Sequence, residues 1–280
     1  MMQRLNEQLN GVGQNGRGVT LIEMVVVITV VGVLAAVGAR LVGSAATGGQ
    51  TSQQRLQLAT AADGALRRMA RELQAALPNS VRVTTSGSSV FIEFVPVLDG
   101  GRLRRAADSA GNGNPLNFED ALDNSFDVLG PPVTTTGSSE LVVQNLGNDL
   151  ADAYGGNNRR SGVVLSNGGT QVGFTAAGAF PDGTGSARFF LVGTPVTFSC
   201  TPAADGTGQV LRLSTYGWAA TQPTAMPSAT QAVLLDGVAA CSAAYTEALA
   251  NLGVVAISLS LGQGDATARL LHQITVDNTP

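Results

Sequence analysis

A long apolar run near the N-terminus constrains this chain more than any other feature. Residues 19–39 read VTLIEMVVVITVVGVLAAVGA, and the polar side chains within the run are Thr20, Glu23 and Thr29. A helix rises about 1.5 Å per residue, so these residues would span about 30 Å, the thickness of the hydrocarbon core of a bilayer. Because Arg40 closes the run, we expect one membrane-spanning helix over residues 19–40.

The charges that flank this run predict which side of the membrane each part occupies. Residues 1–18 are polar and carry Arg4 and Arg17, and positively charged flanks stay in the cytoplasm. The chain after Arg40 is therefore expected in the periplasm. A cleaved secretory signal is the alternative, with small residues at 43–46 as its cleavage site, but such signals have a shorter apolar core of about 7–15 residues.

A carboxylate inside the apolar run needs an explanation. Glu23 lies only a few residues beyond Arg17, toward the expected cytoplasmic edge. A charged side chain in the hydrocarbon core costs on the order of a few kcal/mol and less near the edge, and such residues are usually functional. We therefore expect Glu23 to have a cationic partner.

The sequence around Glu23 resembles a known processing signal. Residues 17–28 read RGVTLIEMVVVI, which is similar to the prepilin motif of type IV pilins and type II secretion pseudopilins. The resemblance implies that a prepilin peptidase cuts between Gly18 and Val19 and methylates the new amine of Val19. It also implies that Glu23 pairs with that amine on a neighbouring pilin or minor pilin subunit in a filament. Val19 departs from the Phe or Met that usually follows the cut.

A second helical pattern follows the membrane run. The Gly-rich residues 43–51 either break the helix or weaken it, so residues 41–78 are predicted as a Gly-rich break and an amphipathic helix. From Ser52 to Leu77 one apolar stripe recurs at helical spacing, and Pro78 ends the pattern. The stripe consists of Leu58, Ala62, Leu66, Met69, Leu73 and Leu77.

Residues 79–280 are predicted to form a β-rich globular domain. Strand-like segments are rich in β-branched and aromatic residues. The residues Asp99-Gly100-Gly101 predict a hairpin turn before a strand at 102–106, and residues 107–138 predict a loop with one helical turn near 118–123. The expected strands are 80–84, 89–97, 140–144, 162–166, 171–175, 187–192, 196–200, 209–216, 232–235, 254–261 and 268–276. The predicted fold class is therefore α+β and pilin-like, with a long N-terminal helix packed on an antiparallel sheet.

Two cysteines, Cys200 and Cys241, are 41 positions apart. This spacing matches no zinc motif. In an exported chain the pair predicts one disulfide, whereas in a cytosolic chain it predicts two free thiols, so the topology decides between them.

Composition and residue spacing argue against catalysis and nucleic-acid binding. The net charge is −4, the pI is near 5.0 and the arginines are scattered, so there is no basic face for nucleic acid. His272 is the sole histidine, and no phosphate loop or zinc ligand set appears. We expect no enzyme and no cofactor, with a calcium site in the acidic region 99–127 as the alternative.

Several short segments resemble one subfamily. Residues 72–73, 76–83, 93–96, 126–131 and 270–280 are similar to the MshO family of minor pilins in the mannose-sensitive haemagglutinin (MSHA) pilus system, which is related to J-type pseudopilins. The resemblance implies a minor pilin that primes or joins a type IV filament. The alternatives are a minor pseudopilin of type II secretion and a membrane-anchored periplasmic enzyme or carbohydrate-binding module. Adhesion through Tyr216 and Trp218 is a further alternative, although aromatic residues on strands are usually core.

Overall fold

The computed structural model describes residues 18–280 except for residues 136, 182–185, 250 and 265, and at residues 42–47 and 249 it describes the backbone alone. The predicted leader, apart from Gly18, lies outside the described residues. The chain divides between Ser52 and Gln53 into two compact units.

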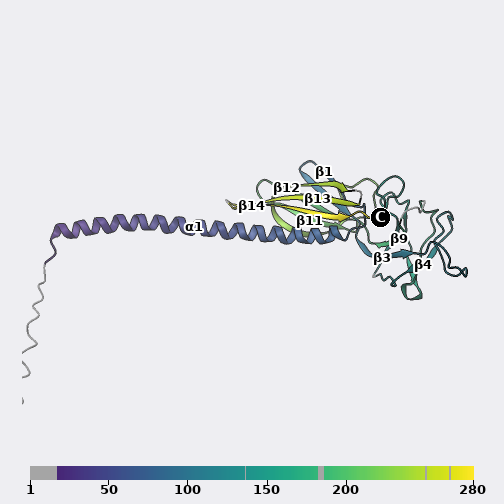
Figure 1. Cartoon of the computed structure of the whole chain (residues 1–280). Helices are drawn as coiled ribbons and strands as arrows, with labels where there is room; N and C mark the ends of the chain where they lie inside the picture. The colour runs from purple at the N-terminus through teal and green to yellow at the C-terminus, as the bar shows by residue number, and fades with distance from the viewer. Residues whose placement is uncertain (1–17, 136, 182–185, 250, 265) are drawn as a thin grey trace, which may run out of the picture. The chain divides into compact units, whose positions relative to one another are not determined.

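The single α-helix of the described residues, α1, runs over Leu21–Gln74 (Figure 1). The break predicted at 43–51 is not observed, because α1 continues through this segment. Each glycine in a helix costs about 1 kcal/mol relative to alanine, but the segment contains no proline to remove a backbone donor. After Gln74 the backbone joins the sheet instead, since the Leu77 N–H donates to the Val95 carbonyl over 2.8 Å.

Two seven-stranded sheets follow, and every described strand pair is antiparallel. The first sheet has the order β1-β2-β10-β11-β12-β13-β14 and the second β6-β5-β9-β3-β4-β8-β7. The predicted α+β class is thus confirmed. The elements are β1 Arg82–Ser86, β2 Ser89–Phe94, β3 Val97–Leu103, β4 Ser125–Leu129, β5 Glu140–Val143, β6 Arg159–Arg160, β7 Val164–Ser166, the 3-10 helix η1 Asn167–Gly169, β8 Gln171–Gly173, β9 Arg188–Val192, β10 Val196–Thr201, β11 Gly208–Ser214, β12 Thr230–Leu249, β13 Leu252–Gln263 and β14 Ala266–Asp277.

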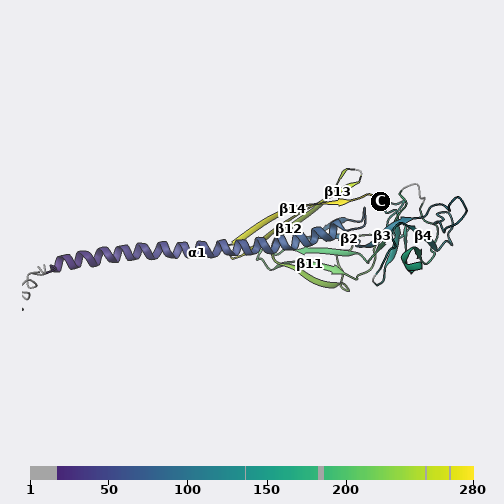
Figure 2. The same ribbon diagram turned by 60° about the horizontal axis from the view of Figure 1, so that its bottom comes forward.

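The second part of α1 packs on the first sheet through the predicted apolar stripe. Leu66 and Leu73 are fully buried, and Met69 lies between them in the same core. Their partners come from both ends of the sheet, for example Ile92 on β2 and Ile257 on β13. Strand β11 and strands β12–β14 flank this part of the helix (Figure 2).

A change of direction in β12 explains how one sheet reaches around a helix. β12 pairs with β11 up to Val238 and with β13 from Val238 onward, and Gly237 at this point has φ +82°. In a flat sheet, β10 and β12 would lie about 9.6 Å apart, two strand spacings. The Cα atoms of Cys200 on β10 and Cys241 on β12 are only 6.6 Å apart. The sheet is therefore bent at Gly237, where positive φ favours glycine.

Two predictions in the β region are wrong. Asp99-Gly100-Gly101 do not form a turn but lie inside β3, paired with β9. A Cβ atom at Gly100 would lie 2.9 Å from the Phe189 carbonyl oxygen, so the glycines here allow the close approach of two strands rather than a reversal.

The segment 107–138 is not a loop throughout. It contains β4, whose Phe126 is fully buried and meets Phe189 edge to face at 5.0 Å between ring centroids. Residues 118–123 form bends and a turn instead of a helical turn, and the Asp120 carboxylate accepts the Leu122 N–H over 2.8 Å. Tertiary burial of one aromatic side chain outweighs the polar composition around it.

Candidate functional site

The start of α1 is the first candidate site, and its geometry follows from the order of four residues. Thr20 caps the helix: its Oγ1 accepts the Glu23 N–H over 3.3 Å, and its carbonyl accepts the Met24 N–H over 3.1 Å. Glu23 thus stands at the third helical position, the spacing of a capping box. A carboxylate in the first turn is also favoured by the helix dipole.

Residues 21–39 of α1 have two polar side chains, Glu23 and Thr29. The two differ in whether the described chain provides a hydrogen-bond partner for them. The Thr29 hydroxyl donates to the Val26 carbonyl over 2.8 Å, so it carries its own partner. Among the described residues, Glu23 forms no ion pair and no side-chain hydrogen bond, and it is exposed. A carboxylate at the start of an apolar helix is thereby left for a cation from outside the described chain.

The apolar part of α1 can cross a membrane by length and composition. Residues Leu21–Leu41 have a mean hydropathy of 2.6, and large apolar side chains such as Leu21 and Ile22 are more than 70% exposed. Exposed apolar surface of this extent needs a lipid or protein environment. The single N-terminal apolar helix fits an inner-membrane anchor.

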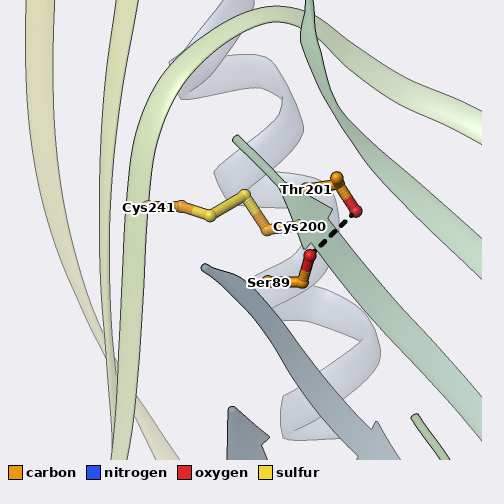
Figure 3. Close-up of a disulfide and its surroundings, with 4 residues drawn as sticks. All are labelled: Ser89, Cys200, Thr201 and Cys241. Atoms are coloured by element: carbon orange, nitrogen blue, oxygen red, sulfur yellow. Dashed lines mark hydrogen bonds between the residues drawn. A yellow bond between two sulfur atoms is a disulfide. The ribbon is translucent and has the colours of Figure 1, made fainter. Parts of the chain in front are cut away.

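The second candidate is the cysteine pair. Cys200 on β10 and Cys241 on β12 form a disulfide (Figure 3). Cys200 is buried and Cys241 is half-buried. Since β11 lies between β10 and β12 in the sheet order, no backbone hydrogen bonds join β10 to β12 at the two cysteines. The disulfide therefore ties together the two arms of the bent sheet.

Tyr216 and Trp218 are half-buried and belong to a polar network that joins side chains from both sheets. Tyr216 Oη donates to Glu93 Oε1 over 2.7 Å, and Trp218 Nε1 donates to Glu140 Oε1 over 2.7 Å. The Arg159 guanidinium lies 3.9 Å from the centre of the Trp218 ring. These contacts fix the segment after β11 against both sheets.

Glu93 is the centre of this network, and the sequence analysis missed it. It is completely buried on β2, and Arg82 Nε lies 2.6 Å from its Oε2. Burial raises the pKa of Glu93, while the hydrogen bonds and charge of Arg82 and the hydroxyl of Tyr216 act to lower it. The available signal was an acid in the apolar run VFIEFV of residues 90–95, since a charge there requires a buried partner.

The acidic region 99–127 uses its carboxylates to order its own backbone. Asp108 accepts the N–H groups of Ala110 and Asn112, and Asp123 accepts the Asn117 N–H. Within the described residues, no group of three His, Cys, Asp or Glu side chains lies close enough to hold a metal ion. His272 is half-buried on β14.

Comparison with known proteins locates one match, and it falls on the first candidate site. Residues 14–39 match the family model described as the prokaryotic N-terminal methylation motif. This motif supports a type IV pilin-like protein, of a pilus or a pseudopilus. No curated protein and no solved structure matches the chain.

We predict that the disulfide holds the arms of the first sheet together. Replacing both cysteines by serine should lower the free energy of unfolding by about 2–4 kcal/mol, because a loop of this length constrains the unfolded chain. Amide hydrogen exchange should rise most in β12 after Val238, which lacks a ladder to β11. Uniform exchange over both sheets, or two free thiols in the wild-type protein by mass spectrometry without reductant, would contradict this assignment.

We also predict a pH dependence that belongs to Glu93. Its folded-state pKa is raised above the ordinary value of 4.5, so the folded state binds more protons between 4.5 and the raised pKa. Its contribution to stability is thus complete below pH 4.5 and is lost as pH rises through the folded pKa. The difference in unfolding free energy between wild type and Glu93→Gln should fall as pH rises above 4.5. A difference that grows with pH would show that the ion pair with Arg82 dominates.

Proposed function

We propose that this protein is a minor pilin of a type IV pilus of the MSHA type, anchored in the inner membrane with its β domain in the periplasm. The observation that carries the proposal is the coincidence of three features at one helix start. They are the match to the methylation motif, a Glu23 side chain with no ion-pair partner among residues 18–280 as described, and the exposed apolar surface of residues 21–41. Removal of a leader between Gly18 and Val19 would place a new amine next to this carboxylate.

The charges of the chain support an amine as the partner of Glu23. The sequence contains no lysine, and residues 19–39 contain no arginine. In a dry bundle of such helices, the terminal amine of Val19 is the one cation that the apolar segments themselves supply. A buried charge without a partner costs several kcal/mol. Pairing Glu23 with the amine of a neighbouring subunit removes this cost and fixes the register between them.

The size of the periplasmic part supports a minor rather than a major subunit. Two seven-stranded sheets follow α1, and a subunit of this bulk is easier to place at a filament end than on every side of a filament. The MSHA assignment rests on the short sequence segments that resemble the MshO family. A type II secretion pseudopilin has the same helix physics, so the identity of the co-purifying filament subunits distinguishes the two.

We predict a mature N-terminus at Val19. Because the chain has no lysine, an amine-reactive tag can modify only the terminal amine, and mass spectrometry of the tagged protein reports its position. The variant Gly18→Leu should accumulate with its leader, although a side chain at Gly18 meets open space in the folded chain. Normal processing of Gly18→Leu, or a wild-type chain that keeps residues 1–18, would contradict the proposed cut.

We predict that Glu23→Ala inserts into the membrane normally but enters filaments at least about tenfold less than wild type, as expected from losing a pair worth a few kcal/mol. Thr29→Ala is the matched control, since Thr29 is also polar and lies in the same apolar helix, but its hydroxyl donates to the Val26 carbonyl of that helix. Immunoblots of membrane and sheared-filament fractions measure both steps. Equal incorporation of the two variants would refute the role of Glu23.

A further inference from the structure

A groove crosses the second sheet on a face that the proposed function does not use. It has a volume of about 550 Å³ and runs over β3 and β9. Residues that line it include Gly100 and Arg102 from β3 and Arg188 and Phe190 from β9. Gly100 pairs with Phe190, and Arg102 pairs with Arg188.

The groove exists because β3 has a glycine where a side chain would otherwise stand. An added Cβ at Gly100 would lie 3.2 Å from Cδ1 of Phe190. Without it, the half-buried Phe190 ring lies beside bare backbone. Since side chains alternate along a strand, Gly100 and Arg102 share one face, while Gly101 contacts Phe189 on the opposite face.

Two arginines stand directly opposite each other at one end of this groove. Like charges at such a cross-strand position destabilise a sheet. Arg102 is exposed, and its side chain has no hydrogen bond or ion pair to any residue in the described part of the chain. Arg188 is also exposed, and its charge reaches Asp277, whose pKa is lowered mainly by hydrogen bonds from Thr279 and to a smaller extent by Arg188. An anion between the two guanidinium groups would relieve their repulsion.

Asp99, which also lines the groove, does not neutralise this pair. Asp99 pairs across the strands with Leu191, whose side chain lies in the core on the other face of the sheet. The Asp99 carboxylate accepts the N–H and the hydroxyl of Thr134 and the N–H of Gly100. Arg102 and Arg188 carry two positive charges, and Asp277 supplies one negative charge near them, so the net charge of these three side chains is positive. The groove therefore favours an anionic ligand, and arginine forks are suited to carboxylates in particular.

The position of the strands decides which class of anionic polymer fits. β3 and β9 are interior strands of the sheet, each paired on both sides. An extended peptide cannot add to them as a further strand, because their backbone groups already have partners. The groove must therefore recognise a ligand through side chains. Phe190 offers a flat aromatic ring for packing, and the arginine pair offers positive charge.

We propose that this groove binds an acidic polysaccharide, with a uronate carboxylate between Arg102 and Arg188 and the sugar ring against Phe190. The proposal concerns the β domain alone and does not depend on filament assembly. It gives the second sheet a recognition role that the N-terminal helix cannot supply.

Binding of oligogalacturonate to the full-length chain in detergent tests the proposal. Arg102→Gln should weaken binding about tenfold, the effect of one charge-assisted contact. Arg269→Gln is the matched control, because it removes the same charge from an exposed position on the first sheet, and it should leave binding unchanged. Circular dichroism and the intact disulfide verify folding of each variant.

Two further probes separate the ring from the charge. The methyl ester of the oligogalacturonate keeps the rings and lacks the carboxylates, and it should not bind. Polyglutamate keeps the carboxylates without sugar rings, and it should bind more weakly than the uronate. The proposal is overturned if the oligogalacturonate does not bind, if Arg102→Gln and Arg269→Gln weaken binding equally, or if polyglutamate binds as tightly.

Discussion

Burial of one helical stripe is the interaction on which the β domain depends. Leu66, Met69 and Leu73 present an apolar ridge that would be exposed on an isolated helix. Complete burial of such a side chain contributes about 1.5–3 kcal/mol. A flat sheet could cover only one side of this ridge. The first sheet instead bends at Gly237 and brings residues from both of its arms, such as Ile92 and Ile257, against the same helix.

The bend removes backbone hydrogen bonds between β11 and β12, and a disulfide and side-chain hydrogen bonds hold the sheet together in their place. Beyond Val238, β12 leaves β11 and pairs with β13 alone, so one edge loses its ladder. The Cys200–Cys241 disulfide crosses this gap. At the other end of the arm, Asn278 donates to the Tyr245 hydroxyl over 2.7 Å and its carbonyl accepts the Asn79 amide over 3.1 Å. The chain thus closes its folded sheet with one covalent bond and a set of side-chain hydrogen bonds.

The sequence predicts the parts of the structure that local periodicity determines, and it misses the parts that depend on distant partners. The apolar stripe of α1 and the alternation in β13 both report a buried face, so the helix and this strand are predictable. Gly100 and Gly101 look like a turn locally, but the rings of Phe189 and Phe190 on another strand require backbone without side chains there. Much of β12 is rich in alanine, a residue that is uncommon in strands, so its strand character comes from its neighbours.

The same distinction applies to the functional residues. Glu23 is visible in the sequence because an acid within an apolar run breaks a local rule, and such violations concentrate where a chain needs a partner. Glu93 breaks the same rule in a strand, yet the structure gives it Arg82 and Tyr216 within the chain. The described chain holds no such partner for Glu23. Glu93 and Glu23 therefore look alike in the sequence but differ in the structure. Glu93 has its partners within the chain, whereas Glu23 is available to a second molecule, and the three-dimensional contacts are needed to tell the two cases apart.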